Sequence, residues 1–206
     1  MIQPNPWSTI WFKPGETIRR IVDTNPQYQL PLLMVLGGIG QTLSNAKGMG
    51  EMFPVSTLIL ICILSGPLSG FLSLYISGFL LHWACKKFGG TATREQVRAV
   101  IAWSWAPIVY TLPLWGVKYI LFRDELFTMK KTFIESHTML TVLYELINFV
   151  DFAIVILYLY ILFAGLSEVN RISVIRSIGA AILVSVLIGL PLLLLLMFMA
   201  PNGLQM

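Results

Sequence analysis

The chain has 206 residues, of which 56% are hydrophobic and only 12% are charged, with a mean hydropathy of +0.77. Soluble domains carry about 25% charged residues, so this composition excludes an ordinary soluble protein and indicates an integral membrane protein with little mass outside the bilayer. Lysine and arginine also gather in the cytoplasmic loops of membrane proteins, so the net charge of +4 is attributed to membrane topology and nucleic-acid binding is not expected.

The N-terminal segment, residues 1–27, has the composition of a membrane-interface element. A short helix is expected after Pro14, with Ile18 and Val22 on one side and Arg19 towards the other. Such an amphipathic helix, preceded by tryptophans, is expected to lie on the membrane surface, where it can anchor the protein or bind a partner. The first dozen residues lack the basic region and apolar run of a cleavable signal peptide, so we expect the N-terminus to be retained.

The rest of the chain predicts an all-α integral membrane domain over residues 28–200, followed by a short tail, residues 201–206. Apolar runs suited to a bilayer core of about 30 Å occur five times. We place the five transmembrane helices at about residues 28–46, 54–85, 97–122, 142–167 and 178–199. The longest loop, residues 123–141, mixes charged and apolar side chains, and we expect it to form an amphipathic helix along the interface.

The second span, residues 54–85, contains no Asp, Glu, Lys or Arg and carries a face of small side chains. As one helix it would be about 45 Å long, against a bilayer core of about 30 Å. Small side chains let helices approach closely in lipid, so we expect this face to pack against another helix; the alternative is that its hydroxyls line a polar path. The face consists of Ser65, Ser69, Ser73, Ser77, Gly66 and Gly70.

Prolines are expected to bend or break three of the spans. Each removes one backbone hydrogen bond within its helix, which leaves a carbonyl to be satisfied by neighbours or water. In the third span this predicts either a kinked packing helix or the discontinuous helix of a transporter site. The expected helix breaks are Pro67, Pro107, Pro113 and Pro191.

Asp151 is the acidic residue that we place clearly inside the bilayer, where a charged carboxylate costs roughly 2.5–3.5 kcal/mol. At 100° per residue, Tyr144, Asn148 and Tyr158 fall in the same narrow sector, so this face is expected to turn inward. Two interpretations stay open: a proton or cation site, or an interhelical hydrogen bond to serines of the second span or to tryptophan indoles of the third. His82, near the end of the second span, is a candidate partner of Asp151.

Catalysis is not expected from the residue pattern. The chain has two histidines, and no nucleophile–base pair, paired carboxylates, zinc motif or glycine-rich phosphate loop falls on a suitable element. We therefore predict no catalytic, cofactor-binding or metal-binding residues and no cofactor. Cys62 lies within a span and Cys85 at its edge, so a structural disulfide between them is not expected.

The distribution of basic residues indicates the orientation. With five spans and the N-terminus inside, nine of the 14 lysines and arginines lie towards the cytoplasmic side and five towards the outside. This bias favours a cytoplasmic N-terminus and an external C-terminus.

Three stretches resemble the Yip family, small membrane proteins first known as partners of Rab-type GTPases. They are NPWSTIWFKPGETIRRIVDTNP, FGGTATREQVRAVIAWSWAPIV and FAGLSEVNRISVIRSIGAA, and the first is especially similar to bacterial members. The resemblance implies five spans, a cytoplasmic N-terminus, residence in the bacterial inner membrane and no catalytic residue. Eukaryotic relatives carry a longer N-terminal region associated with GTPase and coat partners, whereas only about 27 residues precede the first span here, so a GTPase partner is not expected.

Two functional hypotheses follow. In the first, the protein is a non-enzymatic membrane organiser or adaptor whose partners are the lipid bilayer and other membrane proteins or a second copy of itself. Gly70→Leu should then disturb assembly and Asp151→Asn should be tolerated. In the alternative, it is a small oligomeric channel or transporter for protons, ions or a small solute, centred on Asp151, and Asp151→Asn should abolish flux.

Overall fold

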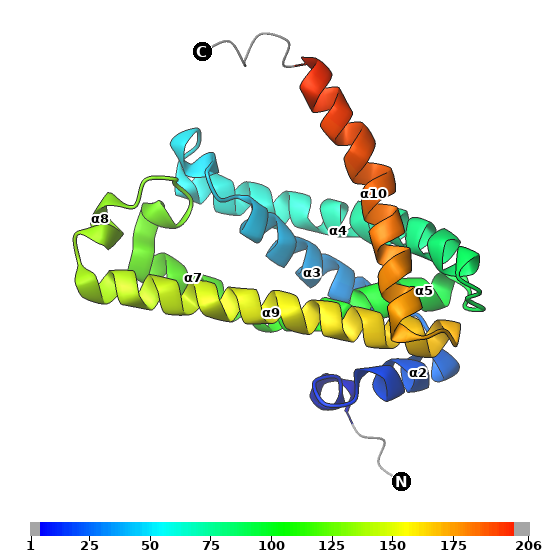
Figure 1. Ribbon diagram of the computed structural model, residues 1–206. Coiled ribbons are helices and arrows are strands. Elements are labelled where there is room, and N and C mark those ends of the chain that lie inside the picture. The colour runs from blue at the N-terminus through cyan, green and yellow to red at the C-terminus, as the bar shows by residue number, and fades with distance from the viewer. Residues whose placement is uncertain (1–4, 200–206) are drawn as a thin grey trace.

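The computed structural model describes residues 5–199, and within them every regular element is a helix (Figure 1). The predicted all-α class is therefore confirmed. The elements are α1 (Pro6–Thr9), α2 (Pro14–Thr24), α3 (Leu30–Asn45), η1 (Met49–Glu51), α4 (Val55–Lys87), α5 (Arg94–Ser104), α6 (Ala106–Tyr110), α7 (Leu112–Phe122), η2 (Arg123–Leu126), α8 (Thr132–Glu135), α9 (Thr138–Asn170) and α10 (Val174–Met199).

Four stretches of the described chain are long and apolar enough to cross a membrane: α4, the α5–η2 stretch, α9 and the first part of α10. The expected first span is α3, whose 16 residues reach only about 24 Å, less than a bilayer core of about 30 Å. In Figure 1, α4 and α9 lie on opposite sides of the bundle, α3 runs diagonally between them, and α10 crosses α4 and extends beyond it. The protein is thus a multi-pass helical membrane bundle in which α3 is a short helix packed along α4.

Glycines bring α3 and α4 into close contact. A Cβ atom added to Gly38 of α3 would collide with the carbonyl oxygen of Gly66 and would lie 2.8 Å from the Cα atom of Gly70. On the other side, a Cβ atom at Gly66 would lie 2.7 Å from the Cα atom of Ile39. Gly66 and Gly70 therefore pack against a helix of the same chain, which is the small-residue approach expected in lipid.

The third span is divided in two places, and a proline lies in the helical turn that follows each division. The helix α5 ends at Ser104 and α6 begins with Pro107 in its first turn, while α7 begins with Pro113 in its first turn. Proline is tolerated at that position because the N–H it lacks has no partner within the helix. The expectation that Pro67 and Pro191 break their helices is wrong, since α4 and α10 continue through them. Each proline removes one hydrogen bond, and long helical segments on either side keep the helix continuous.

The N-terminal amphipathic helix is present as α2, but its apolar face does not meet lipid as we expected. Ile18 and Val22 are buried in the core that α2 shares with α5 and α9. Gly165 of α9 makes room for this packing, because a Cβ atom there would lie 2.6 Å from Cδ1 of Ile18. A protein surface of complementary shape thus covers the apolar face in place of the bilayer.

The loop after α7 also differs from the expectation of an amphipathic helix along the interface. It forms two short turns, η2 and α8, held by side-chain and backbone hydrogen bonds. The carboxylate of Glu125 accepts hydrogen bonds from the backbone N–H groups of Phe133, at 2.6 Å, and Ile134, at 2.9 Å. Phe127 and Ile134 are buried in a second core beside α7 and α9. These bonds and apolar contacts favour a compact cap over a longer helix.

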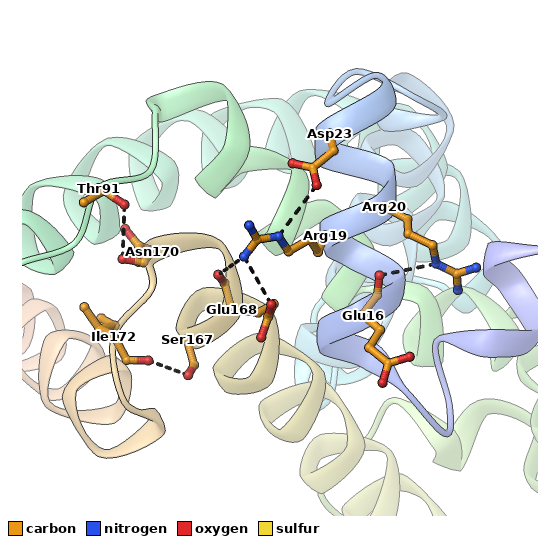
Figure 2. Close-up of polar contacts among 9 residues, drawn as sticks. All are labelled: Glu16, Arg19, Arg20, Asp23, Thr91, Ser167, Glu168, Asn170 and Ile172. Carbon is orange, nitrogen blue, oxygen red and sulfur yellow. Dashed lines mark hydrogen bonds and ion pairs between the residues drawn. The ribbon is translucent and has the colours of Figure 1, made fainter.

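Three segments meet at one end of the bundle: α2, the α4–α5 loop and the α9–α10 turn. The backbone N–H of Thr91 donates to the carbonyl of Asn170 at 3.2 Å, which ties the loop to the turn (Figure 2). Arg19 of α2 lies between Asp23 and Glu168, with its Nη1 3.2 Å from Oε1 of Glu168. We call this the basic end, because nine lysines and arginines belong to these segments and the helical turns beside them: Lys13, Arg19, Arg20, Lys86, Lys87, Arg94, Arg98, Arg171 and Arg176.

Candidate functional site

A cavity of about 770 Å³, which we call the central cleft, lies among α3, α4, α5–α7, α9 and α10. Exposed apolar side chains, among them Phe152 and Ile182, belong to its lining, so the cleft opens to the outside between α9 and α10. Most of the lining is apolar, but several helices each contribute polar groups. The uncharged polar and acidic side chains that line it are Gln41, Ser44, Asn45, Ser73, Ser77, Thr111, Asp151, Tyr158 and Ser185.

Asp151 forms an ion pair with Lys118 of α7 at the wall of the central cleft. The Lys118 Nζ atom lies 2.7 Å from Oδ1 and 2.8 Å from Oδ2 of Asp151, so both carboxylate oxygens accept a hydrogen bond. The Lys118 side chain is only 3% exposed, whereas that of Asp151 is 33% exposed. The acid therefore faces the cleft with part of its surface, and the base lies behind it.

An aromatic ring completes the surroundings of Lys118. Its Nζ atom lies 4.7 Å from the ring centroid of Trp115, one turn earlier in α7, and Trp115 itself lines the cleft. A buried charge is tolerated when it is paired and hydrogen-bonded, and a cation over an aromatic face gains further attraction. Of the two interpretations left open for Asp151, the interhelical hydrogen bond is formed, but its partner is a lysine and not a serine of the second span or a tryptophan indole.

Lys118 is the residue of this site that the sequence analysis missed. A signal was present: Lys118 is the one charged residue in the apolar run LPLWGVKYILF, inside the predicted third span. Ionisable residues within spans usually face the bundle interior and pair with one another. Two opposite charges within separate spans could therefore have been considered as a pair.

The residues expected around Asp151 separate into two groups. Tyr158 lines the central cleft with Asp151, two turns further along α9. Tyr144 belongs instead to the second core, where its ring meets that of Phe122 edge-on at a centroid distance of 5.3 Å. Asn148 is half-buried and is not part of the cleft lining. The shared sector on α9 is thus split between the cleft and the second core.

His82 is not brought to Asp151. It is half-buried in the last turns of α4 and is not among the residues that line the central cleft. Its Nδ1 atom has no hydrogen-bond partner among residues 5–199. The pairing of His82 with Asp151 that we considered is therefore not formed.

The serine face of α4 also divides. Ser73 and Ser77 line the central cleft. Ser65 and Ser69 donate to carbonyls of their own helix, Ser65 to Ile61 at 2.7 Å and Ser69 to Gly66 at 3.0 Å. Two hydroxyls are thus placed at the cleft, while the other two are satisfied within α4.

Both divisions of the third span also lie at the central cleft. Trp105, between α5 and α6, and Thr111, between α6 and α7, belong to its lining. The Thr111 hydroxyl donates to the carbonyl of Ile108 at 2.7 Å, which satisfies one acceptor near the second division. The cleft therefore combines irregular backbone, hydroxyl groups and an ion pair at one place in the bundle.

No metal centre is assembled in the described part of the chain. Among residues 5–199, no three side chains of His, Cys, Asp or Glu come close enough together to hold a metal ion. Cys62 and Cys85 are both buried and unbridged. The groups that line the central cleft offer hydrogen bonding, one compensated ion pair and the charge of Lys47, in the loop after α3.

A family model described as the Yip1 domain matches residues 7–197, which is nearly the whole chain. No curated protein and no solved structure matches the chain significantly. The match covers the bundle and the helix α2 docked against it, and the chain belongs to the Yip family of membrane proteins.

Proposed function

We propose that this Yip-family protein is a non-enzymatic membrane adaptor whose central cleft receives a transmembrane helix of a partner membrane protein. The observation that supports this is a cleft that opens sideways between α9 and α10 and is lined by apolar and hydroxyl side chains. The one acid in its wall, Asp151, is already compensated by Lys118. Lys47, in the loop after α3, is the one basic residue among the described residues of the lining, so the cleft offers contact surface, hydrogen bonds and a single lysine.

The physics of helix association in lipid favours this use. Helices inside a bilayer are already out of water, so the hydrophobic effect does not drive them together. They associate through close packing and interhelical hydrogen bonds. Ser77 of α4 and Ser185 of α10 offer such bonds from two different helices of the lining. A partner helix would bury exposed apolar side chains of α9 and α10, such as Phe152 and Ile182.

Filling the cleft tests the proposal. A photo-reactive amino acid at Ile182 is used to cross-link the protein in native membranes, alone and together with Ser77→Trp. We expect a cross-link to a membrane partner that Ser77→Trp abolishes and that Leu68→Trp, on the exposed face of α4, leaves unchanged. A cross-link of twice the chain's mass would identify a second copy as the occupant. Cross-links to lipid alone, or a partner band that survives Ser77→Trp, would contradict the adaptor role.

A second function, transport through an oligomer, is favoured by one specific observation: both divisions of the third span and Asp151 line the same cleft. Discontinuous helices form the substrate sites of many transporters. The test is proton and monovalent-cation flux in liposomes, for the wild type and for the paired variant Lys118→Met with Asp151→Leu. Flux that disappears in a well-folded paired variant would support transport, and no flux in the wild type would exclude these ions as substrates.

We further infer that the protein resides in a bacterial inner membrane with its basic end in the cytoplasm. The family resemblance and the positive-inside rule support this placement.

A further inference from the structure

The outer face of α4 carries a stripe of four aromatic residues, which we call the aromatic ridge: Phe71, Tyr75, Phe79 and Trp83. Their spacing of four residues places them one above another along the helix. All four are between 38% and 52% exposed, so the ridge lies on the outside of the bundle. The ridge begins near the middle of α4 and runs towards the basic end.

Three cations lie over successive rings of the aromatic ridge. The guanidinium carbon of Arg98 is 4.5 Å from the ring centroid of Tyr75, and that of Arg94 is 5.3 Å from the centroid of Phe79. The Lys87 Nζ atom is 5.6 Å from the ring centroid of Trp83. Basic side chains of α4 and α5 thus place positive charge along the exposed face of α4.

Gly78 makes the contact between Arg98 and Tyr75 possible. A Cβ atom at Gly78 would lie 2.5 Å from Cγ of Arg98, so the aliphatic part of Arg98 passes directly over this glycine. The side chain of Arg98 therefore crosses α4 before its guanidinium reaches Tyr75. Any larger residue at this position of α4 would push the arginine away from the ridge.

Within the described part of the chain, the three cations form no ion pair with a carboxylate. Among residues 5–199, the ion pairs involve Lys13, Arg19 and Lys118 as the bases, and no side-chain hydrogen bond from Lys87, Arg94 or Arg98 to the protein is formed. An aromatic face attracts a cation but accepts none of the in-plane hydrogen bonds of a guanidinium. The donors of Arg94 and Arg98 are therefore available to an external acceptor at the membrane boundary.

We propose that the aromatic ridge and its three cations form a binding site for an anionic phospholipid. The phosphate is held by Arg98 and Arg94, because a guanidinium matches phosphate oxygens in a two-point hydrogen bond, while Lys87 adds a third charge. The acyl chains lie along Phe71 and Tyr75, deeper in the bilayer. Charge complementarity selects an anionic lipid, because the headgroup of a zwitterionic lipid also carries a positive charge, which the three cations repel. This site is independent of the central cleft and of the adaptor role.

Lipid titration of the purified full-length protein in detergent, read by native mass spectrometry, tests the site. Phosphatidylglycerol and phosphatidylcholine with the same acyl chains are the probes. We expect saturable binding of one phosphatidylglycerol, at least about tenfold tighter than phosphatidylcholine, and about fivefold weakening in each of Arg98→Gln and Arg94→Gln. Arg98→Lys should recover part of the loss, because the charge returns without the two-point geometry.

Matched controls separate this site from general attraction to basic residues. Arg171→Gln removes a basic-end charge that is not over the ridge and should leave the affinity within about twofold. Glycerol phosphate added in excess should not displace the lipid, which distinguishes a lipid site from a free-phosphate site. Equal affinity for both lipids, or equal weakening by Arg171→Gln and Arg98→Gln, would overturn the proposal. If Arg98→Gln does not fold, Arg94→Gln and Lys87→Gln, both at exposed positions, decide the outcome.

Discussion

The Lys118–Asp151 pair is unequal in its exposure, and this gives the two residues different energetic roles. Lys118 is almost wholly enclosed by protein, whereas one third of the Asp151 side chain faces the central cleft. Removing one partner of a buried pair leaves the other charge uncompensated, and the cost depends on how well that remaining charge can be solvated. Asp151→Asn, which the adaptor hypothesis expected to be tolerated and the transport hypothesis expected to abolish flux, should therefore lower stability whichever function is correct.

We predict that Asp151→Asn lowers the free energy of unfolding by about 3 kcal/mol or more, because it leaves a buried ammonium unpaired. Lys118→Met should cost about half as much, since Asp151 can still contact water or polar groups in the cleft. The paired variant Lys118→Met with Asp151→Leu should lie close to the wild type. Denaturation in mixed detergent micelles measures all three. A paired variant as unstable as Asp151→Asn, or a reversed order of the two single variants, would show that the pair does not act as described.

The close contact of α3 with α4 depends on glycine, and a matched pair of substitutions tests it. Gly38→Ala should destabilise the protein by about 1–3 kcal/mol, because the added methyl group meets the backbone of Gly66 and Gly70. Gly116→Ala in α7 has no atom within 4 Å of the added group and should stabilise by roughly 0.5–1 kcal/mol, as alanine does in helices. Thermal unfolding in detergent measures both. Equal effects of the two substitutions would contradict the glycine contact.

The attachment of α2 to the bundle is expected to rest on apolar packing more than on its ion pairs. Gly165→Leu should displace Ile18 and increase tryptic cleavage in α2, after Arg19 and Arg20, by about tenfold, in line with an overpacking cost of about 1–3 kcal/mol. Glu168→Gln removes only a partly exposed ion-pair partner, and its effect should stay within about threefold. The measurement is the rate of release of the N-terminal peptide, followed by mass spectrometry.

The control for α2 is Gly189→Leu in α10, where no atom lies within 4 Å of an added Cβ, and it should leave the cleavage rate unchanged. If Glu168→Gln released α2 as readily as Gly165→Leu, the ion pair and not the packing would be the main attachment. This result matters for the membrane role of the segment, since a released α2 would expose its apolar face to lipid.

For the whole molecule, the basic end should lie in the cytoplasm. A membrane-impermeant maleimide added to intact cells should label Lys130→Cys, in the loop at the other end, and should not label Lys87→Cys until the membrane is permeabilised. The native cysteines Cys62 and Cys85 are buried, and the unsubstituted chain serves as the control for them. Labelling of Lys87→Cys in intact cells would reverse the orientation.

Sequence reasoning at the level of single helices was largely sufficient because its signals are local. Apolar length identified the long spans, the prolines at 107 and 113 coincide with the two divisions of the third span, and the periodicity after Pro14 predicted α2. Proline was a poorer guide inside α4 and α10, because the loss of one hydrogen bond does not end a helix whose neighbouring turns are intact.

The sequence by itself determined the class of the protein, the positions of its long helices and the concentration of basic residues at one end, since composition and short-range chemistry decide these features. Only the tertiary structure decided which surfaces meet. Periodicity shows which side chains share a face but not what that face contacts, so it could not pair Asp151 with Lys118, 33 residues away, or place Ile18 against Gly165. The central cleft has the same origin, because it is assembled from helices distant in sequence that the packing of the bundle brings together. The cations over the aromatic ridge come from the consecutive helices α4 and α5, but the placement of Arg98 over Tyr75 depends on how these two helices pack.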